Sequence, residues 1–281
     1  MTSSFIYPRI VEIERIEKYS PDIWEFFFVE ESIANAAKPG QFAMLWIPGT
    51  DEIPLGFARI EKKASIIGFI VQRVGEGTQK LFQMKIGERV GIRGPFGNGF
   101  DLDLWKNKKV HIIGGGVGIA PLMPLTANNS SPLSLDIYYG AKDETALAIS
   151  EVIDRHKPNG SHLHLATENG TLGMRGTVID LVEKQLVSSQ GSLLFLAAGP
   201  ERMLFSLHSF LLQNFPSEEW EFSLCDRYMK CGFGICGSCS LDDLGIRLCV
   251  EGPVLGRTKL SKLSSFGKFG RDASGRKKYF A

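Results

Sequence analysis

The sequence predicts a multidomain protein: an antiparallel β-barrel or sandwich, then an α/β domain with a parallel sheet, then a small irregular domain. Three observations lead to this prediction. Residues 1–104 read as short strands separated by Gly and Pro. From about residue 105, strands alternate with helical segments. All five cysteines lie between positions 225 and 249. A chain of 281 residues is long enough for two or three hydrophobic cores.

The first part is rich in residues that favour strands. The runs that we expect to be strands are 24–29, 41–47, 64–71 and 89–93. Pro39-Gly40 and Gly94-Pro95 are typical turn sequences. The aromatic run Phe26-Phe27-Phe28 is better explained as core than as a ligand site. Many short strands at regular spacing favour a barrel or sandwich.

In the second part, the alternation predicts a parallel sheet with helices on its faces. We expect strands at 108–113, 134–139, 162–166 and 192–198, and helices at 144–156, 177–184 and 201–214. His162 and His164 alternate on one of these strands, but no third ligand lies nearby in sequence, so a surface or packing role is favoured over metal binding. His111 and His208 lie in apolar patterns and are expected to be packed.

A glycine-rich turn follows the strand at 108–113. Glycines there let the backbone approach a phosphate, and a helix that follows offers N–H donors. The strand expected at 192–198 ends at the pair Gly199-Pro200. In open parallel sheets, ligands collect at the carboxyl ends of strands. The alternative is a tight strand–helix turn without a ligand. The candidate nucleotide-binding residues are Gly114, Gly115, Gly116, Gly118, Pro121, Gly199 and Pro200.

Four cysteines have the spacing of a metal site, Cys231-x4-Cys236-x2-Cys239-x9-Cys249. Thiolates are soft ligands, and C-x4-C-x2-C with a distant fourth Cys is typical of plant-type [2Fe–2S] clusters. Structural zinc, the alternative, usually takes two pairs of closely spaced cysteines. Gly232, Gly234 and Gly237 would let the backbone fold around the sulfurs. Cys225 lies outside the pattern and is expected to be a buried structural thiol.

Charge and hydropathy exclude several classes of function. The formal net charge is +1, which argues against a nucleic-acid binder. The first eight residues lack the features of a signal peptide, and no apolar stretch is long enough to span a membrane, so a cytoplasmic protein is expected. Residues 257–281 are basic, and we expect them to be a poorly ordered arm that serves partner docking or solvation.

Taken in order, these motifs resemble the ferredoxin–NADP reductase superfamily and, within it, the electron-transfer subunits of class 1B dihydroorotate dehydrogenases. The cysteine segment and the residues around Cys249 carry the most specific part of the resemblance. The stretches that match are Pro39–Phe42, Gly75–Thr78, Gly94–Phe100, Gly114–Pro121, Gly199-Pro200, Cys231–Cys239 and Leu248–Pro253.

The resemblance implies FAD, a [2Fe–2S] cluster and NAD as cofactors. It implies an FAD-binding β-barrel domain at 1–104, an NAD-binding α/β domain at 105–220, a [2Fe–2S] domain at 221–256 and a basic C-terminal tail at 257–281. Cys231, Cys236, Cys239 and Cys249 would hold the cluster. The implied FAD-binding residues are Pro54, Leu55, Gly56, Phe57, Gly75, Gly77 and Thr78.

One stretch departs from the family pattern. The flavin strand of the family usually begins with an Arg that bridges to phosphate, whereas the matching stretch here reads Ile53-Pro-Leu-Gly-Phe57. Arg59 or Arg73 is a candidate replacement, because a guanidinium suits bidentate phosphate contact.

The implied function is electron transfer between NAD and an FMN-containing dihydroorotate dehydrogenase subunit, in a heterotetramer of two chains of each kind. The substrate site would lie on that partner, so no catalytic acid or base is predicted in this chain. Two alternatives stay open. One is a diaphorase-type subunit of a hydrogenase or sulfur-reducing complex, and the other is a zinc-stapled, nucleotide-sensing binding module.

Overall fold

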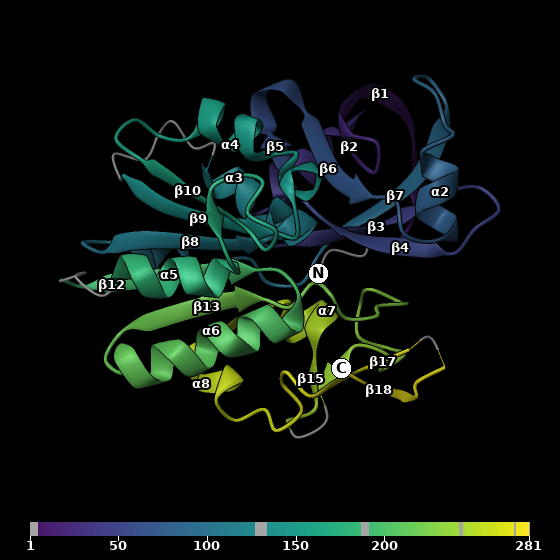
Figure 1. The fold of residues 1–281 in the computed structure, drawn as a ribbon. Coiled ribbons are helices and arrows are strands. Elements are labelled where there is room, and N and C mark those ends of the chain that lie inside the picture. Colours follow the sequence, from purple (N-terminus) through teal and green to yellow (C-terminus); the bar gives the residue numbers. More distant parts are fainter. Residues whose placement is uncertain (1–4, 127–133, 187–190, 242–243, 273, 281) are drawn as a thin grey trace.

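A computed structural model describes residues 5–126, 134–186, 191–241, 244–272 and 274–280. Figure 1 shows the amino-terminal strands in purple and blue, beside a second sheet in teal and green. The carboxyl-terminal segments, in yellow-green, lie below both. Within the described ranges, no helix is long and apolar enough to cross a membrane.

The first sheet has seven strands in the order β4-β3-β7-β1-β2-β6-β5, and all neighbours are antiparallel. All seven strands belong to one barrel-like sheet, so the structure is a barrel and not the sandwich that the sequence also allowed. Phe26, Phe28, Phe57 and Phe69 fill its interior. The elements are β1 (Arg9–Ser20), β2 (Ile23–Val29), α1 (Glu31–Ala36), β3 (Phe42–Trp46), β4 (Glu52–Gly56), β5 (Arg59–Glu61), η2 (Lys62–Ala64), β6 (Ile66–Gln72), α2 (Glu76–Leu81) and β7 (Arg89–Phe96).

The second sheet has the order β11-β10-β9-β8-β12-β13-β16 and is parallel except for the last pair. Strand order reverses at β8, which is where ligands collect in sheets of this kind. The elements are η3 (Leu102–Trp105), β8 (Lys109–Gly115), η4 (Gly116–Leu122), α3 (Met123–Thr126), β9 (Leu135–Ala141), η5 (Glu144–Leu147), α4 (Ser150–His156), β10 (His162–Thr167), β11 (Met174–Arg175), α5 (Val178–Leu186), β12 (Leu193–Ala198), α6 (Glu201–Asn214) and β13 (Glu219–Ser223).

Two predicted helices differ from the structure. The helix expected at 144–156 is divided into η5 and α4, because the backbone leaves the helical conformation at Ile149, which has φ −95° and ψ 4°. The helix expected after the glycine turn begins as the 3₁₀ segment η4, with Pro121 inside it. A proline cannot donate the backbone hydrogen bond of a continuing α-helix.

The remaining segments are short, as the sequence predicts for the cysteine-rich part. They are β14 (Ser240–Leu241), β15 (Ile246–Arg247), α7 (Leu248–Glu251), β16 (Val254–Gly256), α8 (Arg257–Leu260), β17 (Phe269–Arg271) and β18 (Lys277–Tyr279). The prediction of a poorly ordered arm is wrong for the described part of 257–281. Leu260, Leu263 and Phe266 are buried in the same core cluster as Trp220.

The cysteine-rich part packs against both sheets. Its buried Cys239 and Cys249 belong to a core cluster that includes Met44 and Phe96 of the first sheet. Strand β16 pairs with β13 of the second sheet. The cluster segment is therefore held between the two larger regions, in contact with each.

Candidate functional site

The four predicted cluster ligands lie on one loop and a short helix. Cys231, Cys236 and Cys239 precede β14, and Cys249 lies in α7. The sulfur atoms of Cys239 and Cys249 are 3.4 Å apart, and the Cys236 thiol is hydrogen-bonded to that of Cys231. The structure thus arranges the thiols as two pairs, with Cys236 the most exposed.

Backbone amides converge on the sulfur of Cys231. Burial opposes ionisation there, but N–H groups of Cys236, Phe233 and Ile235 donate to the sulfur and lower the pKa of the thiol to about 7. This loop therefore favours the thiolate, which is the form that binds metal.

The thiols of Cys239 and Cys249 form the second pair, and the ionisation of one affects that of the other. The hydrogen bond between the two sulfurs lowers the pKa of the Cys239 thiol to about 7, and the pKa of Cys249 rises in return. Gly234 donates its backbone N–H toward Cys249. The two pairs are thus joined by a backbone amide of the first loop.

The glycines of the cluster loop have the conformations that the sequence predicts for them. Gly232, Gly234 and Gly237 have φ values of +80°, +90° and +74°, a region that side chains disfavour. A Cβ on Gly234 would also lie 2.7 Å from Val250 Cγ2. The tight path around the sulfurs therefore depends on glycine.

This donor set fits an iron–sulfur cluster. Four thiols in two close pairs, with amide donors aimed at the sulfur, suit two irons that each take two thiolates. Among the residues that the structure describes, no three His, Cys, Asp or Glu side chains are placed to hold a single metal ion.

The two glycine-rich nucleotide motifs lie against each other. A Cβ on Gly118 would lie 2.5 Å from Gly199 Cα, and a Cβ on Gly115 would lie 3.0 Å from Pro200 Cδ. Gly116 has a φ of +52°. The backbones therefore meet at the carboxyl ends of the neighbouring parallel strands β8 and β12, where ligands collect in sheets of this kind.

The predicted flavin strand β4 touches the nucleotide turn. A Cβ on Gly56 would lie 3.1 Å from Pro121 Cβ. Pro54 and Leu55 are half-buried, whereas Phe57 is fully buried and packs against Phe69 with ring centroids 5.2 Å apart. The Phe57 side chain therefore belongs to the barrel core, and only its backbone can contribute to a cofactor site.

The predicted pyrophosphate turn begins α2. Thr78 Oγ1 accepts hydrogen bonds from the backbone N–H groups of Val74 and Gly75, at 2.9 and 3.0 Å, and donates to the Gly75 carbonyl. A Cβ on Gly77 would lie 3.3 Å from Ile53 Cγ2 in β4. The Thr78 hydroxyl thus closes the turn, and the turn sits beside the predicted flavin strand.

The opposite end of β4 reaches the cluster loop through an arginine that the sequence did not reveal. Arg93 of β7 donates from Nε to Glu52 Oε1 at 2.6 Å, and from Nη1 to the backbone carbonyl of Cys231 at 2.6 Å. Glu52 begins β4, one position before Ile53, which stands where the family pattern has its arginine. Because 138 positions separate Arg93 from Cys231, no local sequence signal could have indicated this contact.

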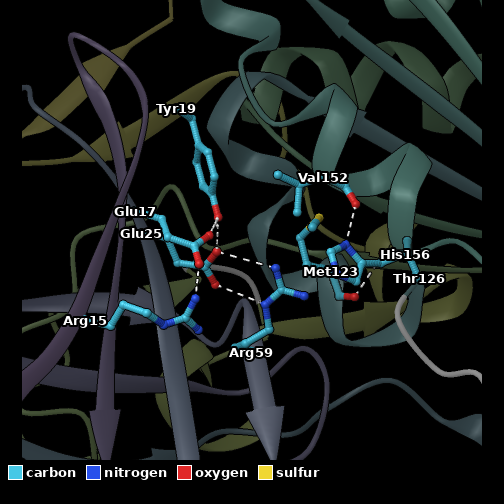
Figure 2. A network of polar contacts seen from close by, with 9 residues as sticks. All are labelled: Arg15, Glu17, Tyr19, Glu25, Arg59, Met123, Thr126, Val152 and His156. Carbon is cyan, nitrogen blue, oxygen red and sulfur yellow. Dashed lines mark hydrogen bonds and ion pairs between the residues drawn. The ribbon is translucent and has the colours of Figure 1, made fainter.

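The two candidate replacements for the phosphate-binding arginine are both ion-paired. Arg59 Nε lies 3.2 Å from Glu25 Oε1, and Figure 2 shows Tyr19 pointing at the same carboxylate. Glu25 is fully buried. Arg73 instead pairs with Asp22 at 2.6 Å on the surface, close to the turn at Gly75.

A groove of about 1380 Å³ opens beside the Tyr19–Glu25–Arg59 network. Its walls come from β1 and β5 on one side and from α3 and α4 on the other, as Figure 2 shows for Arg59 and His156. Acidic and basic side chains line it together, among them Glu17 and Arg155. Apart from Arg59, the predicted flavin, nucleotide and cluster residues do not line it.

Among the remaining candidates, His111 and His208 are buried, as the sequence predicts, whereas His162 is exposed on the surface. Burial lowers the pKa of both His111 and His208 to about 4. His162 and His164 lie on β10 with ring centroids 6.4 Å apart. The Cys225 sulfur lies 2.9 Å from Ser223 Oγ, and burial raises the pKa of this thiol to about 11.

Comparison with known families and proteins gives a consistent result. Residues 226–261 match the model of the iron–sulfur cluster binding domain of dihydroorotate dehydrogenase B. Two relatives are both named probable dihydroorotate dehydrogenase B (NAD(+)), electron transfer subunit. The one from Methanothermobacter thermautotrophicus is 34% identical over 96% of this chain and 97% of its own length. The one from Methanocaldococcus jannaschii is 36% identical over 97% and 99%.

Solved structures agree on the fold. The NADH-dependent reduced ferredoxin-NADP oxidoreductase has a TM-score of 0.77 and 25% identity, covering 92% of this chain and 94% of that chain. The ferredoxin reductase of carbazole 1,9a-dioxygenase has a TM-score of 0.63 and 19% identity, over 74% and 66%. The second likeness concerns the fold alone.

Proposed function

The chain belongs to the family of dihydroorotate dehydrogenase B electron-transfer subunits, and on this premise we propose that it relays electrons between a catalytic partner and NAD. The relay uses FAD and a [2Fe–2S] cluster, both held by this chain, and it serves pyrimidine biosynthesis. The dihydroorotate site lies on the partner, so this chain supplies binding and orientation and no catalytic acid or base.

The position of β4 is the observation that carries the proposal. One end of this short strand, at Gly56, touches Pro121 of the nucleotide turn. The other end, at Glu52, is bonded to Arg93, which also holds the carbonyl of Cys231. The predicted flavin strand therefore lies between the predicted nucleotide and cluster sites, which is the order that a relay requires.

Cys231, Cys236, Cys239 and Cys249 are the proposed cluster ligands. Their pairing and the depressed pKa values of Cys231 and Cys239 support this assignment. Zinc, the alternative that the spacing left open, would draw all four sulfurs around one ion.

The nucleotide and flavin sites depend mainly on backbone. Gly114, Gly115, Gly116 and Gly118, with Pro121, would cradle the NAD phosphates, and Gly199-Pro200 would close the other side. When bound, FAD exchanges a hydride with nicotinamide and single electrons with a cluster. The backbone of Pro54 to Phe57 would orient the flavin ring, and Gly75, Gly77 and Thr78 would receive its pyrophosphate.

Arg73 is the proposed replacement for the family's phosphate-binding arginine. Its pair with Asp22 is exposed, and such pairs contribute only about 0–1 kcal/mol, so a phosphate can displace the carboxylate. Arg59 is less suitable because leaving the fully buried Glu25 without its cation would be costly.

The proposed partner is an FMN-containing dihydroorotate dehydrogenase subunit, in a heterotetramer with two chains of each kind. We place the complex in the cytoplasm, because five cysteines without a disulfide among them suit a reducing compartment. The likeness to the NADH-dependent reduced ferredoxin-NADP oxidoreductase favours one further candidate, a diaphorase-type subunit that serves a different partner.

The test is anaerobic purification of the chain together with the candidate FMN subunit. We expect a brown protein with flavin absorbance and a [2Fe–2S] EPR signal on reduction, and dihydroorotate-dependent reduction of NAD. Cys239→Ser should abolish that activity while FAD is retained.

Three outcomes would contradict the proposal in different ways. Zinc without iron would refute the electron relay. A loaded protein that reduces NAD only with a hydrogenase or sulfur-reducing partner would refute the choice of partner. Unchanged activity in Cys239→Ser would refute the route through the cluster.

A further inference from the structure

Arg93 has the environment of a residue with a structural or functional task. It lies in the middle of β7, its side chain is 8% exposed, and its guanidinium contacts two distant segments. Two of its nitrogens bind the carboxylate of Glu52, and the third donates to the Cys231 carbonyl. A planar guanidinium can make these contacts at once, which an ammonium cannot.

The cluster loop packs on the barrel at this point. A Cβ on Gly232 would lie 3.0 Å from Met44 Cγ and 3.1 Å from the Phe96 ring. The rings of Phe96 and Phe233 each lie 5.5 Å from Arg93 Cζ. The arginine is thus sandwiched between one aromatic ring of the barrel and one of the loop.

A second arginine offers a direct comparison. Arg247 donates to the Gly234 carbonyl at 3.0 Å and pairs with Glu251. This pair is local, four positions apart on the chain, and its side chains are 41% and 35% exposed. Both arginines hold a carbonyl of the cluster loop, but Arg93 and Glu52 connect that loop to the predicted flavin strand.

We propose that Arg93 and Glu52 form a positioning pair that fixes the cluster loop against the flavin strand and sets the electrostatic environment of the cluster. This inference rests on the proposed function, since it assumes a [2Fe–2S] cluster on the four cysteines. Arg93 acts through Cys231 and is not itself a ligand.

The charges of the two residues predict the direction in which each substitution changes the ease of reducing the cluster. Together, Arg93 and Glu52 are neutral. Glutamine at position 93 leaves one negative charge beside the loop, and glutamine at position 52 leaves one positive charge. Reduction adds an electron to the cluster, so a nearby positive charge favours it and a negative charge opposes it. Partial burial limits screening by water.

The main test is redox titration of the loaded protein by EPR. Arg93→Gln should lower the midpoint potential of the cluster and Glu52→Gln should raise it. We expect each to change the reduction equilibrium by about tenfold, which is about 59 mV for a one-electron couple. The double variant should return toward the parent potential. A role in packing alone would not give shifts of opposite sign.

The positioning of the cluster loop is tested on the iron-free protein, where no redox chemistry contributes. Amide hydrogen exchange in residues 231–236 should become faster by about tenfold in Arg93→Gln, since a charge-assisted hydrogen bond to the loop is lost. Arg93→Lys should keep the midpoint potential near that of the parent, because lysine keeps the positive charge. It should not keep the slow amide exchange, because an ammonium lacks the planar set of donors that a guanidinium has.

Two control variants separate the pair from its surroundings. Arg89→Gln removes a cation from the same strand, where Arg89 pairs with Glu12 on the surface, and should change neither readout. Arg247→Gln should also speed amide exchange in the loop. It should not raise the midpoint potential of the cluster, as Glu52→Gln does.

The inference would be overturned, and the proposed function left intact, if the midpoint potentials of Arg93→Gln and Glu52→Gln were equal or shifted in the same direction from the parent. Unchanged exchange in iron-free Arg93→Gln would do the same for the positioning role. A parent protein without iron would instead refute the proposed function, so the two failures are distinguishable.

Discussion

The second, mostly parallel sheet and the cluster region are held together by different kinds of interaction. The central strands β8, β9 and β12 bury continuous apolar runs, including Ile112, Ile137 and Leu196, all at 0% exposure. The cluster region has short strands and relies on polar contacts with distant segments. The sheet should therefore tolerate change at single positions better than the cluster region does.

The contact at Glu201 illustrates the second kind. This buried carboxylate begins α6, directly after the Gly199-Pro200 motif. It pairs with Arg227 at the start of the cluster segment and accepts the backbone N–H of Gly267 at 2.9 Å. One side chain thus joins the nucleotide motif, the cluster segment and the carboxyl-terminal segment.

The strongest test of this comparison removes the cation. Arg227→Ala should lower the free energy of unfolding by about 3–5 kcal/mol, because it leaves Glu201 charged and buried without a partner. Urea denaturation followed by circular dichroism measures this. Arg89→Ala, which breaks an exposed pair with Glu12, is the matched control and should cost less than about 1 kcal/mol. Equal losses would remove the distinction between the two regions.

The second test uses pH. His208 Nδ1 accepts a hydrogen bond from Trp220 Nε1 at 3.0 Å, so protonation would break this contact. Burial, with Arg257 nearby, lowers the pKa of His208 from 6.5 to about 4. The unfolded chain therefore binds the proton first, and stability falls as the pH drops from about 6.5 to about 4. The loss amounts to about 3 kcal/mol.

A glutamine at this position should flatten that dependence. Glutamine can accept from Trp220 and does not titrate, so His208→Gln should lose the part of the acid sensitivity that belongs to this site. His111, in the sheet, has the same lowered pKa of about 4 and should keep its own contribution. Urea midpoints at several pH values measure both. An unchanged slope in the variant would contradict the assignment.

The third test crowds the junction between the nucleotide motifs. Gly118→Ala places a Cβ 2.5 Å from Gly199 Cα, which should cost about 1–3 kcal/mol and weaken NADH binding, with the iron content unchanged. Gly256→Ala is the control, because the nearest contact of its Cβ would be an ordinary 3.9 Å. Calorimetric titration with NADH decides the outcome, and loss of iron in Gly118→Ala would show that the two sites are not independent.

The smallest effect is expected in the sheet core. Ile112→Val removes one methylene from a fully buried position and should cost about 0.5–1.5 kcal/mol, with no effect on the cluster spectrum. Thermal unfolding and visible absorbance together measure this. A larger loss, or a changed spectrum, would mean that the sheet and the cluster region unfold as one unit.

Much of the fold could be predicted from local pattern. The barrel, the parallel sheet and α6 follow from runs of apolar residues and turn signals, which act over a few positions. The composition of residues 144–156 does not reveal the break at Ile149 that divides the predicted helix into η5 and α4. The carboxyl-terminal segment was misjudged because its many basic residues mask Leu260, Leu263 and Phe266, whose partners lie elsewhere in the chain.

Local sequence is enough to predict the chemistry of the candidate site. Cysteine spacing and glycine placement depend on covalent geometry over a few residues, so four thiols on a tight loop and a glycine turn after a strand can be read directly. The tertiary structure alone decided how these parts are joined. The bridge from Glu52 through Arg93 to Cys231, and the pair Glu201–Arg227, each link segments that are far apart in sequence. Arginine and glutamate occur throughout the chain, and only folding selects which of them meet and are shielded from water.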